Sequence, residues 1–222
     1  MADDQRLKIW EGLFERALVL VDDARKRGLP VDEWTFGGGT VLMRRHKHRL
    51  SKDIDIFIDN PEFLGYLTPR LSDAAESLTT DYVEDTEYVK LRFPDGEIDF
   101  VVAAPLSNQP ANRESILGHT FLVETSTEIV AKKIWHRAAT FTARDIFDLA
   151  MVSEREPDAL KEIYPILSDK RETVLKRIAD TETLLRETFN ELLILEYRRS
   201  FDECVGIVKS TLATASSTVE KT

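Results

Sequence analysis

The chain has 222 residues, of which 42% are hydrophobic, so it can bury one sizeable core or a core with a helical appendage. Its formal net charge of -10 argues against a protein dedicated wholly to nucleic-acid binding, because contacts to phosphate need clustered lysine and arginine. The single cysteine, Cys204, excludes an intrachain disulfide and a metal cluster held by thiols.

No apolar run approaches the ~20 residues that cross a bilayer, and the first residues lack an apolar signal segment. We therefore expect a cytoplasmic protein without a membrane partner. The acidic balance still leaves room for local basic patches, at residues 44–49, 132–144 and 170–177.

The chain begins with a pattern of helix, strand, glycine turn and helix. Apolar residues at helical spacing predict an amphipathic helix from about Asp4 to Arg27, which Gly28 and Pro30 end. A short strand at 34–36 then runs into three glycines at 37–39, and a second helix starts directly after them.

Strands follow. Polar and apolar residues alternate at 53–58, which predicts a strand with Asp53 and Asp55 on the same face. A turn signal at 94–96 predicts an antiparallel hairpin. The other elements expected in this half are a helix at about 61–77, the hairpin strands at 88–93 and 97–102, and a strand at 120–124.

The sequence of the second half of the chain predicts helices. Thr125 and Glu128 have the spacing of a capping box before a helix that ends near Ala138, and Thr142 can cap the next helix, to about Ser153. Small polar residues at the end predict fraying. The expected organisation is an α+β core at 1–125, a helical region at 126–209 with two or more long helices from 170, and a flexible tail at 210–222.

Three aspartates are the candidate chemical centre. Asp53 and Asp55 on one strand face repel each other unless a cation neutralises them, and carboxylates are hard ligands that suit Mg²⁺. Asp99 joins them if its strand pairs beside theirs. Three carboxylates can hold two metal ions, one to activate an attacking hydroxyl and one to stabilise leaving pyrophosphate.

The glycine turn supplies a second feature. In Gly37-Gly38-Gly39-Thr40, a turn before a helix lets backbone N–H groups approach a phosphate at the positive end of the helix dipole. The phosphate loop of P-loop NTPases is absent from the sequence.

Together these motifs resemble a known superfamily. Gly38-Gly39, thirteen residues, then Asp53-Ile54-Asp55-Ile56 resembles the signature of DNA polymerase β type nucleotidyltransferases. More narrowly, the chain resembles the AbiEii/AbiGii toxin family over roughly residues 34–150. The segments that carry this likeness are Gly38-Gly39-Thr40-x-Leu42, Arg49-x-Ser51-x-Asp53-Ile54-Asp55, Ala131-Lys132-Lys133-Ile134, Arg137, and Arg144-Asp145-Ile146-Phe147-Asp148-Leu149.

The resemblance implies a small mixed or antiparallel sheet of the polymerase-β type with flanking helices, and a helical region that completes the site. It implies transfer of a nucleotide from an NTP to an acceptor hydroxyl by the toxin of a toxin–antitoxin or abortive-infection system. RNA, especially tRNA, is the implied acceptor, and a cognate antitoxin is an implied partner.

Residue roles also follow from the resemblance. Nucleotide binding is implied for Gly38, Gly39, Thr40, Arg49, Ser51 and Lys132. Catalytic roles are implied for Asp53 and Asp55 as metal ligands, and for Lys133 and Asp145. Asp99 joins the expected catalytic residues and metal ligands through the strand argument above. Lys132 is the rival register of the phosphate-binding Lys133. Gly37 departs from the family, which usually has a hydrophobic residue there.

Ordinary structural roles compete with these assignments. The Asp53–Asp55 pair can belong to an exposed edge strand, and Asp99 to the solvent face of a hairpin. Asp145 lies at the third position after Thr142, where a carboxylate can accept a free backbone N–H group at the start of a helix.

Further structural alternatives concern charged and small residues. Asp148 can pair with Arg144, and Arg49 and Ser51 can be loop residues. Lys132, Lys133 and Arg137 can form a solvated helix face. His46 and His48 are expected as exposed basic residues rather than a zinc pair, and Cys204 as a buried apolar residue.

Three rival functions remain. The acceptor can be a protein or a small molecule such as an antibiotic. A kinase-like reaction can phosphorylate Ser51. A degenerate fold can bind a partner without catalysis.

Overall fold

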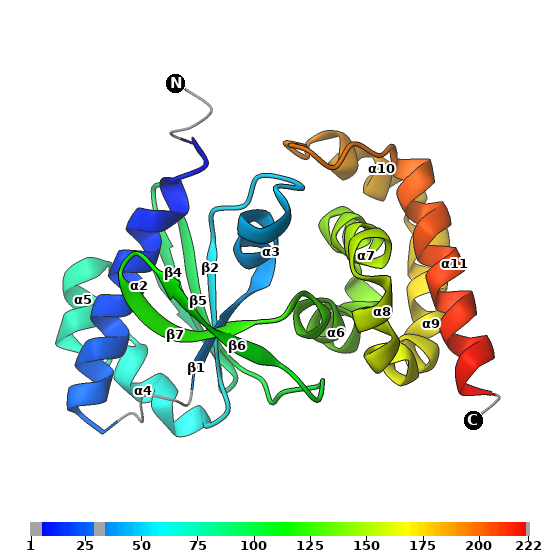
Figure 1. Cartoon of the computed structure of the whole chain (residues 1–222). Coiled ribbons are helices and arrows are strands. Elements are labelled where there is room, and N and C mark those ends of the chain that lie inside the picture. The colour runs from blue at the N-terminus through cyan, green and yellow to red at the C-terminus, as the bar shows by residue number, and fades with distance from the viewer. Residues whose placement is uncertain (1–5, 29–33, 221–222) are drawn as a thin grey trace. The chain divides into compact units, whose positions relative to one another are not determined.

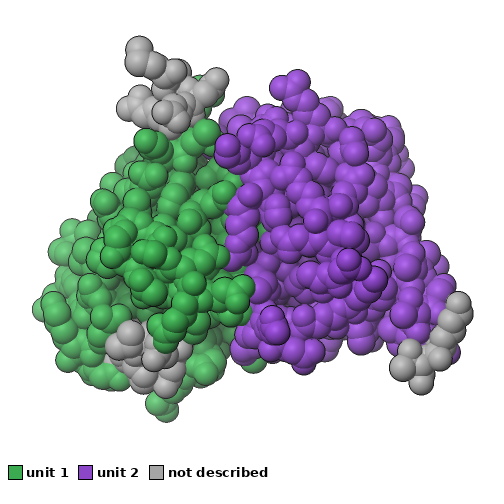
Figure 2. All heavy atoms as spheres, in the orientation of Figure 1, with its two compact units in different colours: residues 1–44, 51–104, 111–124 green, residues 45–50, 105–110, 125–222 purple. Residues whose placement is uncertain are grey.

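The structure is a computed structural model that describes residues 6–28 and 34–220. It divides into two compact units (Figure 2). The sheet unit comprises residues 1–44, 51–104 and 111–124, and the helical unit comprises residues 45–50, 105–110 and 125–222. The predicted α+β class with a C-terminal helical region is confirmed.

One mixed seven-stranded sheet forms the sheet unit, in the order β3-β4-β5-β2-β1-β7-β6 (Figure 1). Its strands are β1 (Trp34–Gly37), β2 (Ile54–Ile58), β3 (Tyr82–Glu84), β4 (Tyr88–Phe93), β5 (Gly96–Val102), β6 (Ala111–Ile116) and β7 (His119–Glu124). The predicted hairpin is the antiparallel pair β4–β5. The short β3 and the polar β6 were not predicted, since neither alternates clearly in sequence.

Helices of the sheet unit cover the face of the sheet that buries its apolar residues. They are α2 (Ile9–Lys26), α4 (Leu64–Leu67) and α5 (Asp73–Leu78), with a 3₁₀ turn at Pro61–Phe63. The expected continuous helix at 61–77 is therefore broken, and a turn at 68–72 separates α4 from α5. The expected helix start at Asp4 and the stop at Pro30 lie outside the described residues. Phe14 of α2 packs on Phe36 of β1, with ring centroids 4.6 Å apart.

Strand alternation places the acidic residues on the other face. Ile54, Ile56 and Phe100 are completely buried. Asp55, between the two isoleucines, and Asp99, next to Phe100, are half-buried. Because side chains alternate along a strand, the carboxylates between these apolar positions share the opposite face. The glycine turn leads from β1 into α3 (Gly38–His46).

Helices build the second unit. They are α6 (Ser126–Arg137), α7 (Ala143–Arg155), α8 (Pro157–Leu160), α9 (Tyr164–Asp180), α10 (Glu182–Asn190) and α11 (Phe201–Val219), with 3₁₀ turns at Ala138–Thr140 and Lys161–Ile163. Residues 45–50 join this unit, since 47–50 pair through the backbone with 193–196, for example Leu195 N–H to the His48 carbonyl at 2.9 Å.

Two local predictions were wrong in this unit. The expected frayed tail at 210–222 is helical to Val219, because Val208, Leu212 and Ala215 recur at helical spacing and are completely buried. At the start of α6 only half of the predicted capping box forms. Thr125 accepts the Glu128 N–H, but the Glu128 carboxylate accepts the backbone N–H groups of residues 106 and 107 instead.

Candidate active site

The sheet places Asp55 and Asp99 side by side. Strands β2 and β5 pair in parallel, and their register opposes Ile54 to Ile98 and Asp55 to Asp99. Both carboxylates therefore lie on the half-buried face of the sheet. The expectation that the strand of Asp99 pairs beside that of Asp53 and Asp55 matches this register.

The positive charge near Asp99 does not offset the burial of its carboxylate and the negative charge beside it. The pKa of its carboxyl is raised to about 6, first by burial and then by the negative charge of Asp55. Lys90 of β4 opposes Asp99 in the antiparallel register and donates from Nζ to Oδ2 at 2.9 Å, which acts in the other direction. The second oxygen, Oδ1, is buried and has no hydrogen-bond partner.

Asp53 lies at the start of the same row but turns toward β5. Its Oδ1 accepts the backbone N–H of Glu97 at 3.1 Å. Over residues 6–28 and 34–220, no three histidine, cysteine, aspartate or glutamate side chains gather closely enough to hold a metal ion. The donor chemistry nevertheless suits a hard divalent cation, because Asp99 offers a buried carboxylate oxygen without a partner beside a second carboxylate.

The glycine turn lies directly against this acidic pair. Gly38 has a φ of +74°, a left-handed conformation that favours glycine, and a Cβ placed on it would lie 1.9 Å from Oδ2 of Asp55. Gly38 and Gly39 are the first residues of α3, and both are buried. The first turn of α3 therefore begins next to the carboxylate of Asp55.

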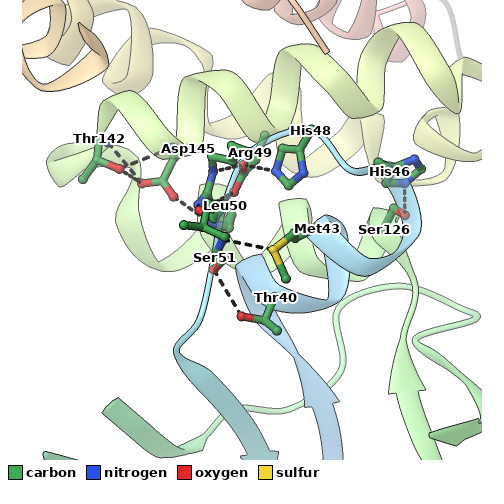
Figure 3. A network of polar contacts seen from close by, with 12 residues as sticks. Thr40, Met43, His46, His48, Arg49, Leu50, Ser51, Ser126, Thr142 and Asp145 are labelled. Carbon is green, nitrogen blue, oxygen red and sulfur yellow. Dashed lines mark hydrogen bonds and ion pairs between the residues drawn. The ribbon is translucent and has the colours of Figure 1, made fainter. Parts of the chain in front are cut away.

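Thr40 ties the glycine turn to the chain segment that precedes β2. Its hydroxyl lies 2.6 Å from the carbonyl oxygen of Asp53 and 3.2 Å from the hydroxyl of Ser51 (Figure 3). The Ser51 N–H donates to the sulfur of Met43 at 3.2 Å. Thr40 and Ser51 are thus brought together, and their implied role in nucleotide binding stays a prediction.

A buried glutamate, which the sequence did not reveal, extends the acidic row. β1 pairs with β2 and β7 so that Gly37 lies between Asp55 and Glu124. Glu124 is 1% exposed, and a Cβ on Gly37 would lie 2.1 Å from its Oε2. The glycine that departs from the family pattern therefore makes room for this carboxylate.

The helical unit holds a different, well-compensated network around Asp148. Arg49 donates to both carboxylate oxygens, at 2.7 and 2.8 Å, and His48 Nε2 lies 2.8 Å from Oδ1. Lys133 Nζ lies 2.9 Å from Oδ2. Burial alone would raise the pKa of Asp148, but Arg49 and Lys133 hold it well below its usual range.

Asp145 belongs to the same network and caps α7. It forms a capping box with Thr142 (Figure 3). Its Oδ1 accepts from Lys133 Nζ at 2.7 Å. Burial acts to raise the pKa of the Asp145 carboxyl, and the charges of Lys133 and Arg137 lower it overall. Asp145 thus has the alternative role, that of a residue capping the start of a helix. Its implied catalytic role stays a prediction.

Several simple structural expectations were wrong here. The alternative pairing of Asp148 with Arg144 is wrong, because Asp148 pairs with Arg49. Arg49 does lie in a loop, between α3 and β2, but it is only 3% exposed. His48 is completely buried rather than exposed, because its ring contacts the buried carboxylate of Asp148. Burial lowers the pKa of His48. His46 is half-buried against Glu156.

The lysines of α6 are not a solvated face. Lys132 is 6% exposed, with Nζ 3.5 Å from Glu128 Oε1, and Lys133 is buried between Asp145 and Asp148. Arg137 alone matches that alternative, since 55% of its side chain is exposed. Cys204 is completely buried, as expected, and burial raises the pKa of its thiol to about 12.

Comparisons with known proteins agree with this fold. Two crystal structures from Helicobacter pylori match over nearly the whole chain. A nucleotidyltransferase candidate is 16% identical with a TM-score of 0.56, covering 98% of this chain and 97% of its own. JHP933 is 15% identical with a TM-score of 0.54, covering 95% and 92%. These likenesses show the fold.

No curated protein matches the chain significantly in sequence. Within the described part of the chain, no helix is long and apolar enough to cross a membrane. The model of the family described as "Nucleotidyl transferase AbiEii toxin, Type IV TA system" matches residues 23–216. The chain therefore belongs to this family of nucleotidyltransferases.

Proposed function

We propose that this nucleotidyltransferase moves a nucleotide from an NTP to an acceptor hydroxyl with the help of Mg²⁺. One observation carries the proposal: the carboxylates of Asp55 and Asp99 lie in register beside the glycine turn at the start of α3. Facing carboxylates attract a divalent cation, and the start of a helix attracts phosphate, so a metal-bound triphosphate fits both.

Each group of the sheet unit has a defined task in this proposal. Asp55 and Asp99 would hold the cation, which when bound neutralises the charge that develops on the phosphoryl oxygens. Gly38 and Gly39 would donate backbone N–H groups to the triphosphate. Thr40 would keep the glycine turn and the segment before β2 in a fixed geometry through its contact with the Asp53 carbonyl.

Family membership is the basis for the proposed roles of residues in the helical unit. Arg49, Lys132 and Lys133 remain proposed phosphate ligands, and Asp145 remains the proposed last acidic residue of the site. Their contacts within the helical unit give them structural tasks as well. A variant at these positions therefore needs a stability measurement beside every activity measurement.

RNA is the proposed acceptor, with the 3′ end of tRNA as the first candidate. Besides the family, an exposed tryptophan supports it: Trp135 of α6 is 44% exposed, and Lys170 Nζ lies 4.4 Å from its ring centroid. Aromatic faces with adjacent cations bind unpaired bases by stacking while neutralising phosphate. A protein or an antibiotic is the alternative acceptor.

The decisive experiment is incubation with labelled NTPs, Mg²⁺ and a cell extract. We expect label in RNA; label in protein or in a small molecule would replace the acceptor. Asp55→Ala should abolish transfer while the protein stays folded, and Asp81→Ala, at an exposed carboxylate of the same unit, is the matched control. Full activity of Asp55→Ala would refute the proposed site.

A toxin role with a cognate antitoxin follows from the family description. We expect expression of the chain to arrest growth and Asp55→Ala to relieve the arrest. Calorimetric titration with Mg²⁺ and NTP separates this enzyme from a degenerate binding protein, which would show no metal-dependent nucleotide binding.

A further inference from the structure

Ser51 is the residue at which the chain enters the sheet unit again, after residues 45–50 of the helical unit. Strand pairing does not yet fix its position, because β2 begins only at Ile54. Two side chains of α3 contact it instead, those of Thr40 and Met43 (Figure 3). These two residues are three positions apart and therefore on one face of the helix. One face of α3 thus holds Ser51.

Met43 holds the backbone of Ser51. Its thioether sulfur accepts the Ser51 N–H at 3.2 Å, which is a close distance because sulfur is larger than oxygen. Met43 is 3% exposed, so packing keeps its side chain in place. A thioether is a weak acceptor, but an N–H group that loses its only acceptor in a partly buried place is costly. The sulfur therefore fixes the point from which the Ser51 side chain starts.

The hydroxyl of Ser51 is held more loosely than its backbone. Thr40 has one hydroxyl proton, and the carbonyl oxygen of Asp53, 2.6 Å away, can only accept it. Ser51 is therefore the donor in its 3.2 Å contact with Thr40. That distance exceeds the range of about 2.5–3.0 Å that is usual between two oxygens. The Ser51 proton can thus turn to a phosphate oxygen while the backbone stays in place.

We infer that Met43 is a positioning residue for nucleotide binding, whose sulfur fixes the Ser51 backbone so that the Ser51 hydroxyl can donate to a phosphate of the NTP. This inference rests on the proposed function and on the nucleotide-binding role that the family implies for Ser51. Met43 does not touch the nucleotide. A methionine that only filled the core beside α3 would affect stability, whereas a positioning residue affects binding of the NTP through Ser51.

Met43→Leu tests the inference, because leucine fills a similar volume but lacks the sulfur acceptor. We expect the KM for the NTP to rise about 5- to 20-fold and kcat to stay within about twofold, since a misplaced Ser51 weakens binding of the NTP. Met151→Leu is the matched control, at a completely buried methionine of the helical unit, and should leave both constants unchanged. An unchanged KM of Met43→Leu overturns the inference.

A double-mutant cycle separates positioning from packing. Ser51→Ala removes the hydroxyl, so Met43→Leu should raise KM no further in that background. Effects that multiply in the double variant would show that Met43 acts by another route, and would overturn the inference. Hydrogen exchange gives a second measurement that needs no nucleotide. The Ser51 amide of Met43→Leu should exchange at least about tenfold faster than that of the wild type, and an equal rate would also overturn the inference.

The outcomes distinguish this inference from the proposed function. Calorimetric titration with Mg²⁺ and NTP and the labelled-NTP assay are run on the same preparations. Wild-type protein that binds and transfers, with Met43→Leu equal to it, leaves the function intact and overturns the inference, whereas wild-type protein that does neither overturns both. If Met43→Leu does not fold, norleucine in place of methionine in a Met151→Leu background changes only Met1 and Met43 and gives the same comparison.

Discussion

Replacing Asp148 by asparagine is the sharpest test of the network in the helical unit. The substitution keeps the shape of the side chain but removes the negative charge that Arg49, His48 and Lys133 surround at 2.7–2.9 Å. Asp148 is completely buried, so water cannot replace the lost charge. Breaking a buried ion pair by removing one partner costs about 3–5 kcal/mol.

The structure places the expected cost at the lower end of that range. Lys133 keeps Asp145 at 2.7 Å after the substitution, so the loss falls mainly on Arg49 and His48. We therefore expect Asp148→Asn to lower the free energy of unfolding by about 3 kcal/mol. For a chain of this length that corresponds to a melting temperature lower by roughly 6–12 °C.

Thermal melts and urea titrations of purified protein measure this change. Asp158→Asn is the matched control, because it removes the same charge from an exposed pair with Lys161 and should leave the melting temperature unchanged. A melting temperature of Asp148→Asn within about 2 °C of the wild type would refute the view that Asp148 holds the network together.

Four further predictions concern single positions. Asp99→Asn should raise the melting temperature without divalent ions, since it removes a charge buried beside Asp55, and should abolish labelled-NTP transfer. Gly38→Ala should lower stability in urea by at least about 1–3 kcal/mol, because its Cβ would meet a carboxylate at a φ of +74°. Burial lowers the pKa of His48 below 6.5, so the folded state binds the proton less readily than the unfolded chain. The wild type should therefore lose stability as pH falls below about 6.5, and melts of His48→Gln between pH 7.5 and 5 should lack that part of the loss. Trp135→Ala should raise KM for an RNA acceptor about 5- to 100-fold with an unchanged melting temperature, and an unchanged KM would exclude stacking on this ring.

The acidic pair could be predicted because its signals are local. Alternation along 53–58 predicted the face on which Asp55 lies, although the strand begins at Ile54 and Asp53, just before it, is directed to the Glu97 N–H. The turn at 94–96 predicted the hairpin that carries Asp99. The place of Lys90 could not be predicted in the same way. Its partner depends on the exact register between β4 and β5, and a slip of one residue would turn it to the other face.

No local sequence pattern indicated the network around Asp148. His48 and Asp148 are 100 residues apart, and nothing in the pattern around residue 48 distinguishes a buried histidine from one in a basic surface run. The helical end of the chain is different. Its apolar residues at 208, 212 and 215 were visible in the sequence, but the small polar residues between them outweighed that signal.

The two charged clusters differ in a way that indicates which one needs a ligand. In the helical unit, cations outweigh the cost of burial, and the pKa of Asp148 lies well below its usual range. In the sheet unit, burial and Asp55 outweigh Lys90, and the pKa of Asp99 rises to about 6. A carboxylate that its own protein leaves partly uncompensated gains most from an added cation, since the cation favours the ionised form. The charges of the first cluster thus balance one another without a ligand, whereas we expect a metal-bound nucleotide to stabilise the protein at the second cluster, beside the glycine turn.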